Sequence, residues 1–172
     1  MPGLLHRIDA GTSGLVLAGL SQEAWRFVRD QFSARSVPKT YLARVVGNVD
    51  RPGGASGFLA HSSSFRGKMR PVASDRLPGG ERAMFAETFW KPLSRSGGTT
   101  LLQVEIRTGV THQIRCHLAA AGHPVEGDVL YGAPAPLSGP HGRFHRLHSL
   151  SATIALPSGA RKTVRAPLPP WA

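Results

Sequence analysis

The sequence predicts an α+β fold, with a mixed, mainly antiparallel sheet and a few flanking helices. Segments with the composition of strands outnumber segments with a helical repeat of apolar residues, and the two kinds do not alternate regularly along the chain. The length of 172 residues suits one domain with a core of its own. Because no internal repeat or linker-like stretch divides the chain, residues 1–172 are expected to form a single domain.

The N-terminal quarter is expected to hold a strand, a helix and a second strand. The apolar run at residues 15–18 predicts a short buried strand. Ser21 is a suitable N-cap for a helix that should end before Pro38. The apolar residues of this helix recur on one face: Trp25, Val28 and Phe32. Residues 41–46 have the β-branched content of a strand.

Loops are predicted at three later places. Pro and Gly are dense at residues 51–57 and 133–142, which predicts irregular structure there. Residues 62–78 are polar and carry four cationic side chains: Arg66, Lys68, Arg70 and Arg76. This third segment is either a hairpin whose cations contact phosphate groups or a solvated loop.

Three strands and one helix complete the prediction. Residues 101–107 alternate as a half-buried strand does. Thr111 can cap a helix that runs to Ala121. Residues 147–156 and 162–166 predict a closing pair of strands around a Pro-Ser-Gly turn.

The composition indicates an acidic partner. The chain has 21 Lys and Arg against 10 Asp and Glu, which leaves a formal net charge of +11. Charge of this sign and size is typical of proteins that bind nucleic acid, although a merely basic surface gives the same count.

The composition also excludes several classes of protein and site. A single cysteine, Cys116, rules out an internal disulfide and a Cys-based zinc cluster. His112 and His117 are five residues apart, not the three or four that place two ligands on one helix face, so no metal site is expected. The apolar run at residues 14–20 is shorter than the roughly 20 residues of a membrane span. No secretory signal is recognisable, and we expect a cytoplasmic protein without membrane contact.

One carboxylate stands between basic residues and a small polar turn. The stretch at residues 6–14 reads HRIDAGTSG, with Asp9 after His6 and Arg7 and before Thr12. Its two glycines allow tight backbone geometry, and its hydroxyls can fix the turn. A lone acid in a basic surface suits chemistry on a polyanionic substrate, but Asp also caps turns for structural reasons.

Three ordered stretches resemble the RluA-type family of RNA pseudouridine synthases: HRIDAGTSGL at 6–15, PKTYLARV at 38–45 and RTGVTHQIRCHL at 107–118. The resemblance extends over residues 4–169. It implies the pseudouridine synthase catalytic fold and isomerisation of specific uridines in structured rRNA or tRNA. It implies no metal or organic cofactor and no obligate protein partner, with a monomer as the expected state.

The resemblance also assigns roles to residues. Asp9 matches the family's essential aspartate, Tyr41 the tyrosine that contacts the target base, and Arg115 the arginine expected to pair with that aspartate. A carboxylate can act as a nucleophile or as the base that removes the C2′ proton, and both remain open. The residues expected to bind the substrate or support the pocket are His6, Arg7, Thr12, His112 and Gln113.

The chain departs from the family pattern in two ways. It begins only five residues before the motif of Asp9, whereas family members usually carry several dozen residues first, so the usual N-terminal segment and an S4-like RNA-binding domain are expected to be missing. Val110 stands where the family usually has an Arg.

Two other functions remain open from the sequence. The first is a catalytically weak RNA-binding protein on the same fold, impaired by the missing N-terminal segment. The second is a glycosylase that releases uracil. It would need a second carboxylate, Glu126 or Asp128, although the turn at 127–128 is more simply a structural corner.

Overall fold

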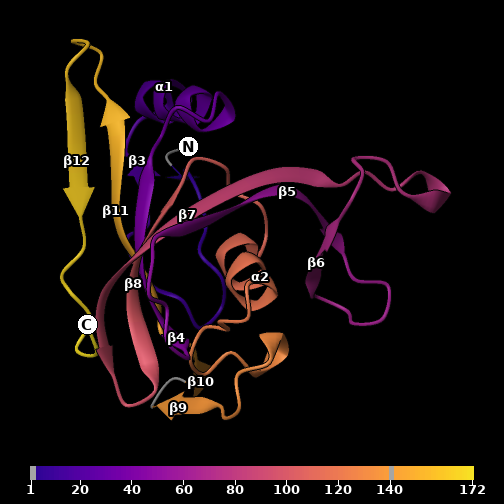
Figure 1. The fold of residues 1–172 in the computed structure, drawn as a ribbon. Coiled ribbons are helices and arrows are strands. Elements are labelled where there is room, and N and C mark those ends of the chain that lie inside the picture. Colours follow the sequence, from indigo (N-terminus) through magenta and orange to yellow (C-terminus); the bar gives the residue numbers. More distant parts are fainter. Residues whose placement is uncertain (1–2, 140–141) are drawn as a thin grey trace.

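A mixed sheet with one helix packed on its face forms the body of the protein, as a computed structural model that describes residues 3–139 and 142–172 shows (Figure 1). The strands follow the order β12 (Arg161–Arg165), β11 (Leu147–Ala155), β4 (Lys39–Val46), β8 (Thr99–Ile106), β7 (Met84–Ser96), β5 (Gly53–His61) and β6 (Met69–Val72). All these pairs are antiparallel, and only β2 (Ser13–Gly14) joins in parallel, against β11. The predicted α+β fold with a mainly antiparallel sheet is confirmed.

Shorter elements surround this sheet. They are β1 (Gly3–Leu4), β3 (Ala18–Gly19), α1 (Gln22–Ser33), η1 (Pro78–Gly80), α2 (Gln113–Ala120), η2 (Val129–Tyr131), β9 (Leu137–Gly139) and β10 (Gly142–Phe144). Strands β1 and β3 pair with each other, as do β9 and β10. Within the described residues, neither helix is long and apolar enough to cross a membrane.

Helix α1 begins and ends where the sequence indicates. The Ser21 hydroxyl accepts a hydrogen bond from the Ala24 amide at 3.1 Å, which satisfies one of the free N–H groups of the first turn. Val28, on the predicted apolar face, is the one residue of the helix classed as buried. The helix ends at Ser33, well before Pro38.

Helix α2 packs against the centre of the sheet and forms the main core with it (Figure 1). The strand residues of this core alternate along β4 and β8, as expected for strands with one face buried. They are Tyr41, Ala43, Val45, Leu102, Val104 and Ile106, and the helix contributes Ile114 and Leu118. Because Ile114 and Leu118 pack in this core, the orientation of α2 on the sheet is fixed.

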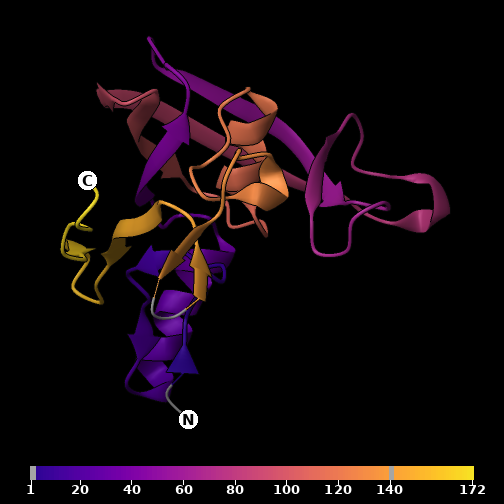
Figure 2. The same ribbon diagram turned by 90° about the horizontal axis from the view of Figure 1, so that it is seen from below.

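A second core lies where β5, β6 and β7 leave the body of the sheet. It contains Leu59, Met69 and Ala86 from the three strands, with Cys116 of α2 packed against them. Beyond it, residues 62–68 and 73–83 form an arm that projects from the molecule (Figures 1 and 2). We call residues 58–85, which comprise these two segments and the strand residues that connect them to the sheet, the projecting arm.

Three of the predicted elements are wrong. Residues 53–57 belong to β5 rather than to a loop, because the long strand β7 supplies a pairing partner at each of them. Residues 15–18 are not a buried strand: the Leu15 amide bonds to Ser149 and Leu17 accepts from Leu5, so this run changes partner halfway. The predicted loop at 133–142 contains β9 and the first residue of β10, while 140–141 lie outside the described residues.

Gly14 is required where β2 meets β11. Its φ is +108°, and a Cβ placed there would lie 2.8 Å from the Ser149 amide nitrogen and closer still to the Ser149 carbonyl. We expect Gly14→Ala to lower the free energy of unfolding by about 3 kcal/mol, because the backbone of β2 would have to move away from β11. Urea unfolding measures this.

Gly57→Ala is the matched control, since a Cβ at Gly57 meets nothing within 4 Å. It should change stability by less than about 1 kcal/mol, in the stabilising direction. Equal losses for the two variants would contradict the proposed close approach at Gly14.

Candidate active site

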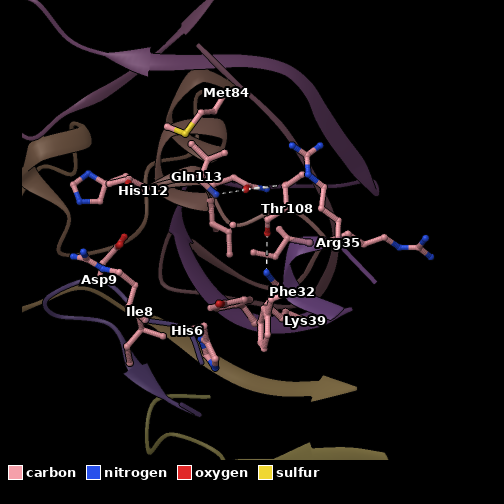
Figure 3. A pocket seen from close by; sticks show the side chains of 18 of the residues that line it. His6, Ile8, Asp9, Phe32, Arg35, Lys39, Met84, Thr108, His112 and Gln113 are labelled. Atoms are coloured by element: carbon pink, nitrogen blue, oxygen red, sulfur yellow. Dashed lines mark hydrogen bonds between the residues drawn. The ribbon is translucent and has the colours of Figure 1, made fainter. Parts of the chain in front are cut away.

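A pocket of about 430 Å³ opens between the loop of Asp9, the end of α1, the first residues of β4 and the segment that leads into α2. Asp9 and Tyr41 line it. So do all five residues expected to bind substrate: His6, Arg7, Thr12, His112 and Gln113. Figure 3 shows Asp9 and His112 close together on one side of the pocket. The structure therefore brings together the residues that the sequence singles out in three separate stretches.

Arg115 lies behind the pocket and joins two carboxylates. Its Nε and Nη2 donate to the two oxygens of Asp128 at 2.6 and 2.9 Å, a bidentate pair. Its Nη1 donates to Asp9 Oδ2 at 3.2 Å. The side chains of Arg115 and Asp128 are only 6% and 2% exposed, whereas that of Asp9 is 20% exposed toward the pocket.

The charges around Arg115 keep it protonated despite its burial. Burial alone would lower the pKa of Arg115, but its hydrogen bonds to Asp128 and the charges of Asp128 and Asp9 outweigh this and raise the pKa. One oxygen of Asp9 is held by the guanidinium, and its Oδ1 has no hydrogen-bond partner among the described residues. The carboxylate is thus oriented while one oxygen stays available to a ligand.

Asp128 is a residue whose role the sequence left undecided. As the bidentate partner of a buried arginine, it is the structural corner predicted for the turn at 127–128 rather than a second acid in the pocket. It is absent from the pocket lining, as is Glu126, which bonds to Arg146 at 2.8 Å. The pocket therefore presents one carboxylate, Asp9, among the described residues.

The loop of Asp9 is attached to the C-terminal strands through two histidines. Thr12 Oγ1 bonds to His145 Nε2, and Ser13 Oγ to His148 Nδ1, both at 2.8 Å. His148 Nε2 lies 3.0 Å from the Pro167 carbonyl, which can only accept, so Nε2 carries the proton and Nδ1 accepts from Ser13. These two bonds hold the loop of Asp9 against residues 145–148.

Helix α2 begins later than the sequence indicates, and Thr111 does not cap it. The helix starts at Gln113, after His112 in the left-handed region with φ of +52°, and no side chain caps its first turn. The amide of Val110 is instead satisfied by Gln113 Oε1 at 3.1 Å. A cap at Thr111 would require His112 to be helical, but its backbone is in the left-handed region.

The buried side chain of Gln113 fastens the segment before α2 to the sheet. Its Oε1 also accepts from Thr108 Oγ1 at 2.9 Å, and its Nε2 donates to the Glu87 carbonyl at 2.7 Å and to Thr88 Oγ1 at 3.1 Å. All four amide interactions are thus made, as a buried polar group requires. Gln113 acts on the pocket chiefly by holding its wall in place.

Tyr131, to which the sequence analysis gave no role, lies behind the pocket and contacts both Arg115 and His112. The Tyr131 ring lies under the Arg115 guanidinium, 5.1 Å from its centre, and its hydroxyl accepts from the Met69 amide at 2.8 Å. His112 Nδ1 lies 3.2 Å from the same hydroxyl. Burial raises the pKa of Tyr131 to about 12, and burial with the charge of Arg115 lowers that of His112, so both stay neutral at pH 7.

Tyr41 and His6 have defined places in the pocket. Tyr41 is buried on the core face of β4, and this burial raises the pKa of its hydroxyl. His6 Nε2 accepts from the Leu17 amide at 3.1 Å, and its ring stacks on Phe32 with centroids 5.2 Å apart. Within residues 3–139 and 142–172, no group of three or more His, Cys, Asp or Glu side chains could hold a metal ion.

The pair of Asp128 with Arg115 can be compared with an exposed pair of the same chemistry. Asp128→Ala leaves a buried guanidinium without its bidentate partner, and we expect a loss of about 3–5 kcal/mol in the free energy of unfolding. Asp50 bonds to Arg95 at 2.7 Å, but its side chain is 68% exposed, so Asp50→Ala should cost about 0–1 kcal/mol. Urea unfolding of both variants provides the test, and equal costs would contradict it.

His145 makes the protein sensitive to acid. Burial, with the charge of Arg115 adding to it, lowers the pKa of His145 to about 4, so the unfolded chain binds its proton first as the pH falls below 6.5. The neutral form therefore stabilises the fold fully above pH 6.5 and progressively less as the pH falls toward 4. His145→Gln should reduce the stability difference between pH 7 and pH 5 by about 2 kcal/mol.

His61→Gln is the control for this measurement, because His61 is exposed at the end of β5. It should leave the difference in unfolding free energy between the two pH values as it is in the wild type. A His145→Gln variant with an unchanged difference would contradict the role given to the buried ring.

Comparison with known proteins agrees with this geometry. The sequence profile of RNA pseudouridylate synthases matches residues 1–120. An uncharacterised RNA pseudouridine synthase of Chloroflexus aurantiacus is 34% identical over 169 residues, which are 98% of this chain and 50% of the relative. A ribosomal large subunit pseudouridine synthase D of Nitrosomonas europaea is 33% identical over 134 residues, 78% of this chain and 37% of the relative.

A solved structure shares the fold. Human RNA Pseudouridylate Synthase Domain Containing 1 superposes with a TM-score of 0.81 at 27% identity, over 98% of this chain and 70% of that one. The chain spans half or less of the length of the two bacterial relatives above. The profile match covers most of the chain and includes Asp9, Tyr41 and Arg115, and it confirms the resemblance found in the sequence: the chain belongs to the RNA pseudouridylate synthase family.

Proposed function

We propose that this protein isomerises uridine to pseudouridine in RNA, with Asp9 as the catalytic carboxylate. The observation that carries the proposal is the geometry at Asp9, whose one oxygen is fixed by Arg115 while the other faces a pocket shared with Tyr41. Family membership supports the reaction class.

The reaction needs little more than such a group. The bond from ribose C1′ to uracil N1 breaks, the base turns, a bond from C1′ to C5 forms, and the proton of C5 is lost while N1 gains one. The carboxylate of Asp9 acts either as a nucleophile or as the base that moves a proton at C2′. Tyr41 lies where its ring can pack against the base, and its hydroxyl stays protonated because its pKa is raised.

The substrate has to present a single nucleotide to this pocket. A uridine in a helix is out of reach of Asp9, so it must leave the stack before any chemistry occurs. The net charge of +11 supports binding of the surrounding RNA. The projecting arm carries Arg66, Arg70, Arg76 and Arg82, all exposed, and we assign it to RNA backbone contact (Figure 2).

The names of some relatives decide which RNA we propose to test first. Several of them are named ribosomal large subunit pseudouridine synthase D, which makes ribosomal RNA the first substrate to test and transfer RNA the second. His6, Arg7, Thr12, His112 and Gln113 are proposed to position the nucleotide, directly or through the pocket wall. The alternative function is that of an RNA-binding protein with weak catalysis, and the experiment below distinguishes it from an active isomerase.

Asp9→Asn should lower the rate of isomerisation by at least roughly 10²–10⁴-fold while RNA binding stays close to that of the wild type, because the amide keeps the shape but not the charge. The purified protein is incubated with unmodified ribosomal and transfer RNA, and pseudouridine is mapped by carbodiimide adducts and primer extension. Asp30→Asn, an exposed acid on α1, is the control and should retain activity.

New pseudouridine sites that depend on Asp9 would establish the reaction and identify the RNA together. RNA binding without any new site, the same for wild type and Asp9→Asn, would instead support the RNA-binding alternative. Full activity of Asp9→Asn would remove Asp9 from the mechanism.

A further inference from the structure

The pocket lining carries cationic side chains that have no chemical role in the proposed isomerisation. Its lining includes five Lys and Arg side chains: Arg7, Arg29, Arg35, Lys39 and Arg107. None of the five forms an ion pair with a carboxylate in residues 3–139 and 142–172. Arg7 belongs to the motif of Asp9, and Arg29 donates a hydrogen bond to the Leu5 carbonyl at 3.1 Å. The remaining three, Arg35, Lys39 and Arg107, we call the basic arm of the pocket.

Lys39 is the most unusual member of the basic arm. Only 7% of it is exposed, although it lines the pocket. Its ammonium donates to the Thr108 carbonyl at 2.9 Å and lies 5.6 Å from the centre of the Phe32 ring. An ammonium has three N–H donors, and this is the one hydrogen bond that it makes among the described residues.

Holding a cation in this way costs stability. Burial lowers the pKa of Lys39 to about 8, because no carboxylate compensates for the lost water. An anion bound beside the ammonium would reverse that effect and satisfy the donors that the protein leaves free. The uncompensated charge of Lys39 therefore favours the binding of a negative group in the pocket.

Arg35 and Arg107 frame the same part of the pocket. Arg35 lies two residues after the end of α1, in the left-handed region with φ of +54°. Arg107 precedes Thr108, whose carbonyl accepts the hydrogen bond from Lys39. Both side chains are exposed. Figure 3 shows Lys39, Phe32 and Arg35 across the pocket from Asp9 and His112.

We propose that the basic arm binds a backbone phosphate next to the target nucleotide, so that the ribose is fixed while Asp9 acts on it. This inference rests on the proposed function. A uridine that enters the pocket brings its phosphates with it, because they are covalently attached. Guanidinium groups and an ammonium are the usual ligands of phosphate oxygens, and such contacts fix register without reading sequence.

The binding of uridine 3′,5′-bisphosphate, compared with that of uridine, tests this proposal without turnover. We expect the bisphosphate to bind the wild type at least about tenfold more tightly, as measured by calorimetry or by NMR titration at low salt. Lys39→Met, Arg35→Gln and Arg107→Gln should each remove most of this advantage and leave the affinity for uridine unchanged. Arg161→Gln, an exposed residue of β12, is the matched control and should bind both compounds as the wild type does.

The outcomes separate this proposal from the one before it. Equal affinity of the wild type for the two compounds, or no detectable binding of the bisphosphate, would overturn the phosphate subsite. So would variants that weaken uridine and bisphosphate equally, since that is what a purely structural role predicts. If Lys39→Met does not fold, the two exposed arginine variants still decide the matter. Asp9→Asn should keep bisphosphate binding, so a failure of the isomerisation would leave this result intact.

Discussion

The guanidinium of Arg115 is a charge that the protein can bury only by providing partners for its N–H groups. Taking such an ion out of water costs several kcal/mol unless its donors are paired, and here Asp128, Asp9 and the ring of Tyr131 together complete its environment. These partners come from two distant parts of the chain, Asp9 from the N-terminal loop and Asp128 and Tyr131 from the segment of η2. The helix that carries Arg115 is in turn fixed in the core by Ile114 and Leu118. The orientation of Asp9 is therefore a consequence of how α2 packs on the sheet.

The polar groups around the pocket differ in how far they are satisfied. Gln113, Thr108 and Thr88 form a buried network in which each group has a partner, and such a network makes one arrangement of the wall more stable than any other. In the described part of the chain, the buried side-chain nitrogens without a partner belong to Arg44 and Arg146, outside the pocket lining. The pocket cations, by contrast, lack carboxylate partners. A binding site needs a well-ordered wall and charged groups that are free to pair with a ligand. Such unpaired charges reduce the stability of the protein without its ligand.

Local patterns decided which elements the sequence could predict. Helix α1, β4, β8 and the pair of β11 with β12 are confirmed, because each carries a cap or a regular apolar repeat within its own residues. Strand β5 was missed, since its glycines and the preceding Pro52 favour a loop, and only pairing with β7 makes it a strand. The start of α2 was predicted too early because Thr111 looks like a cap, whereas the helix begins after His112 in the left-handed region and has no side-chain cap.

The site was predictable in part, for a related reason. The resemblance indicated Asp9, Tyr41 and Arg115, and the structure places the first two in one pocket with the third bonded to Asp9. The partner of Arg115 at Asp128 could not be derived from spacing, because 13 residues and a turn separate them. Lys39 had a signal that was available: it occupies the first core-facing position of a strand that continues with Tyr41, Ala43 and Val45. A lysine in that register must be buried.

The two hydrogen bonds from the loop of Asp9 to His145 and His148 join residues 133 and 135 positions apart. During translation, at about 5–20 residues per second, the loop is made roughly 7 to 27 seconds before its partners. Until residues 145–155 are made, the loop of Asp9 lacks both of these bonds, and β2 lacks its partner strand β11. A chain that ended before residue 145 would form the loop of Asp9 without either of these two hydrogen bonds.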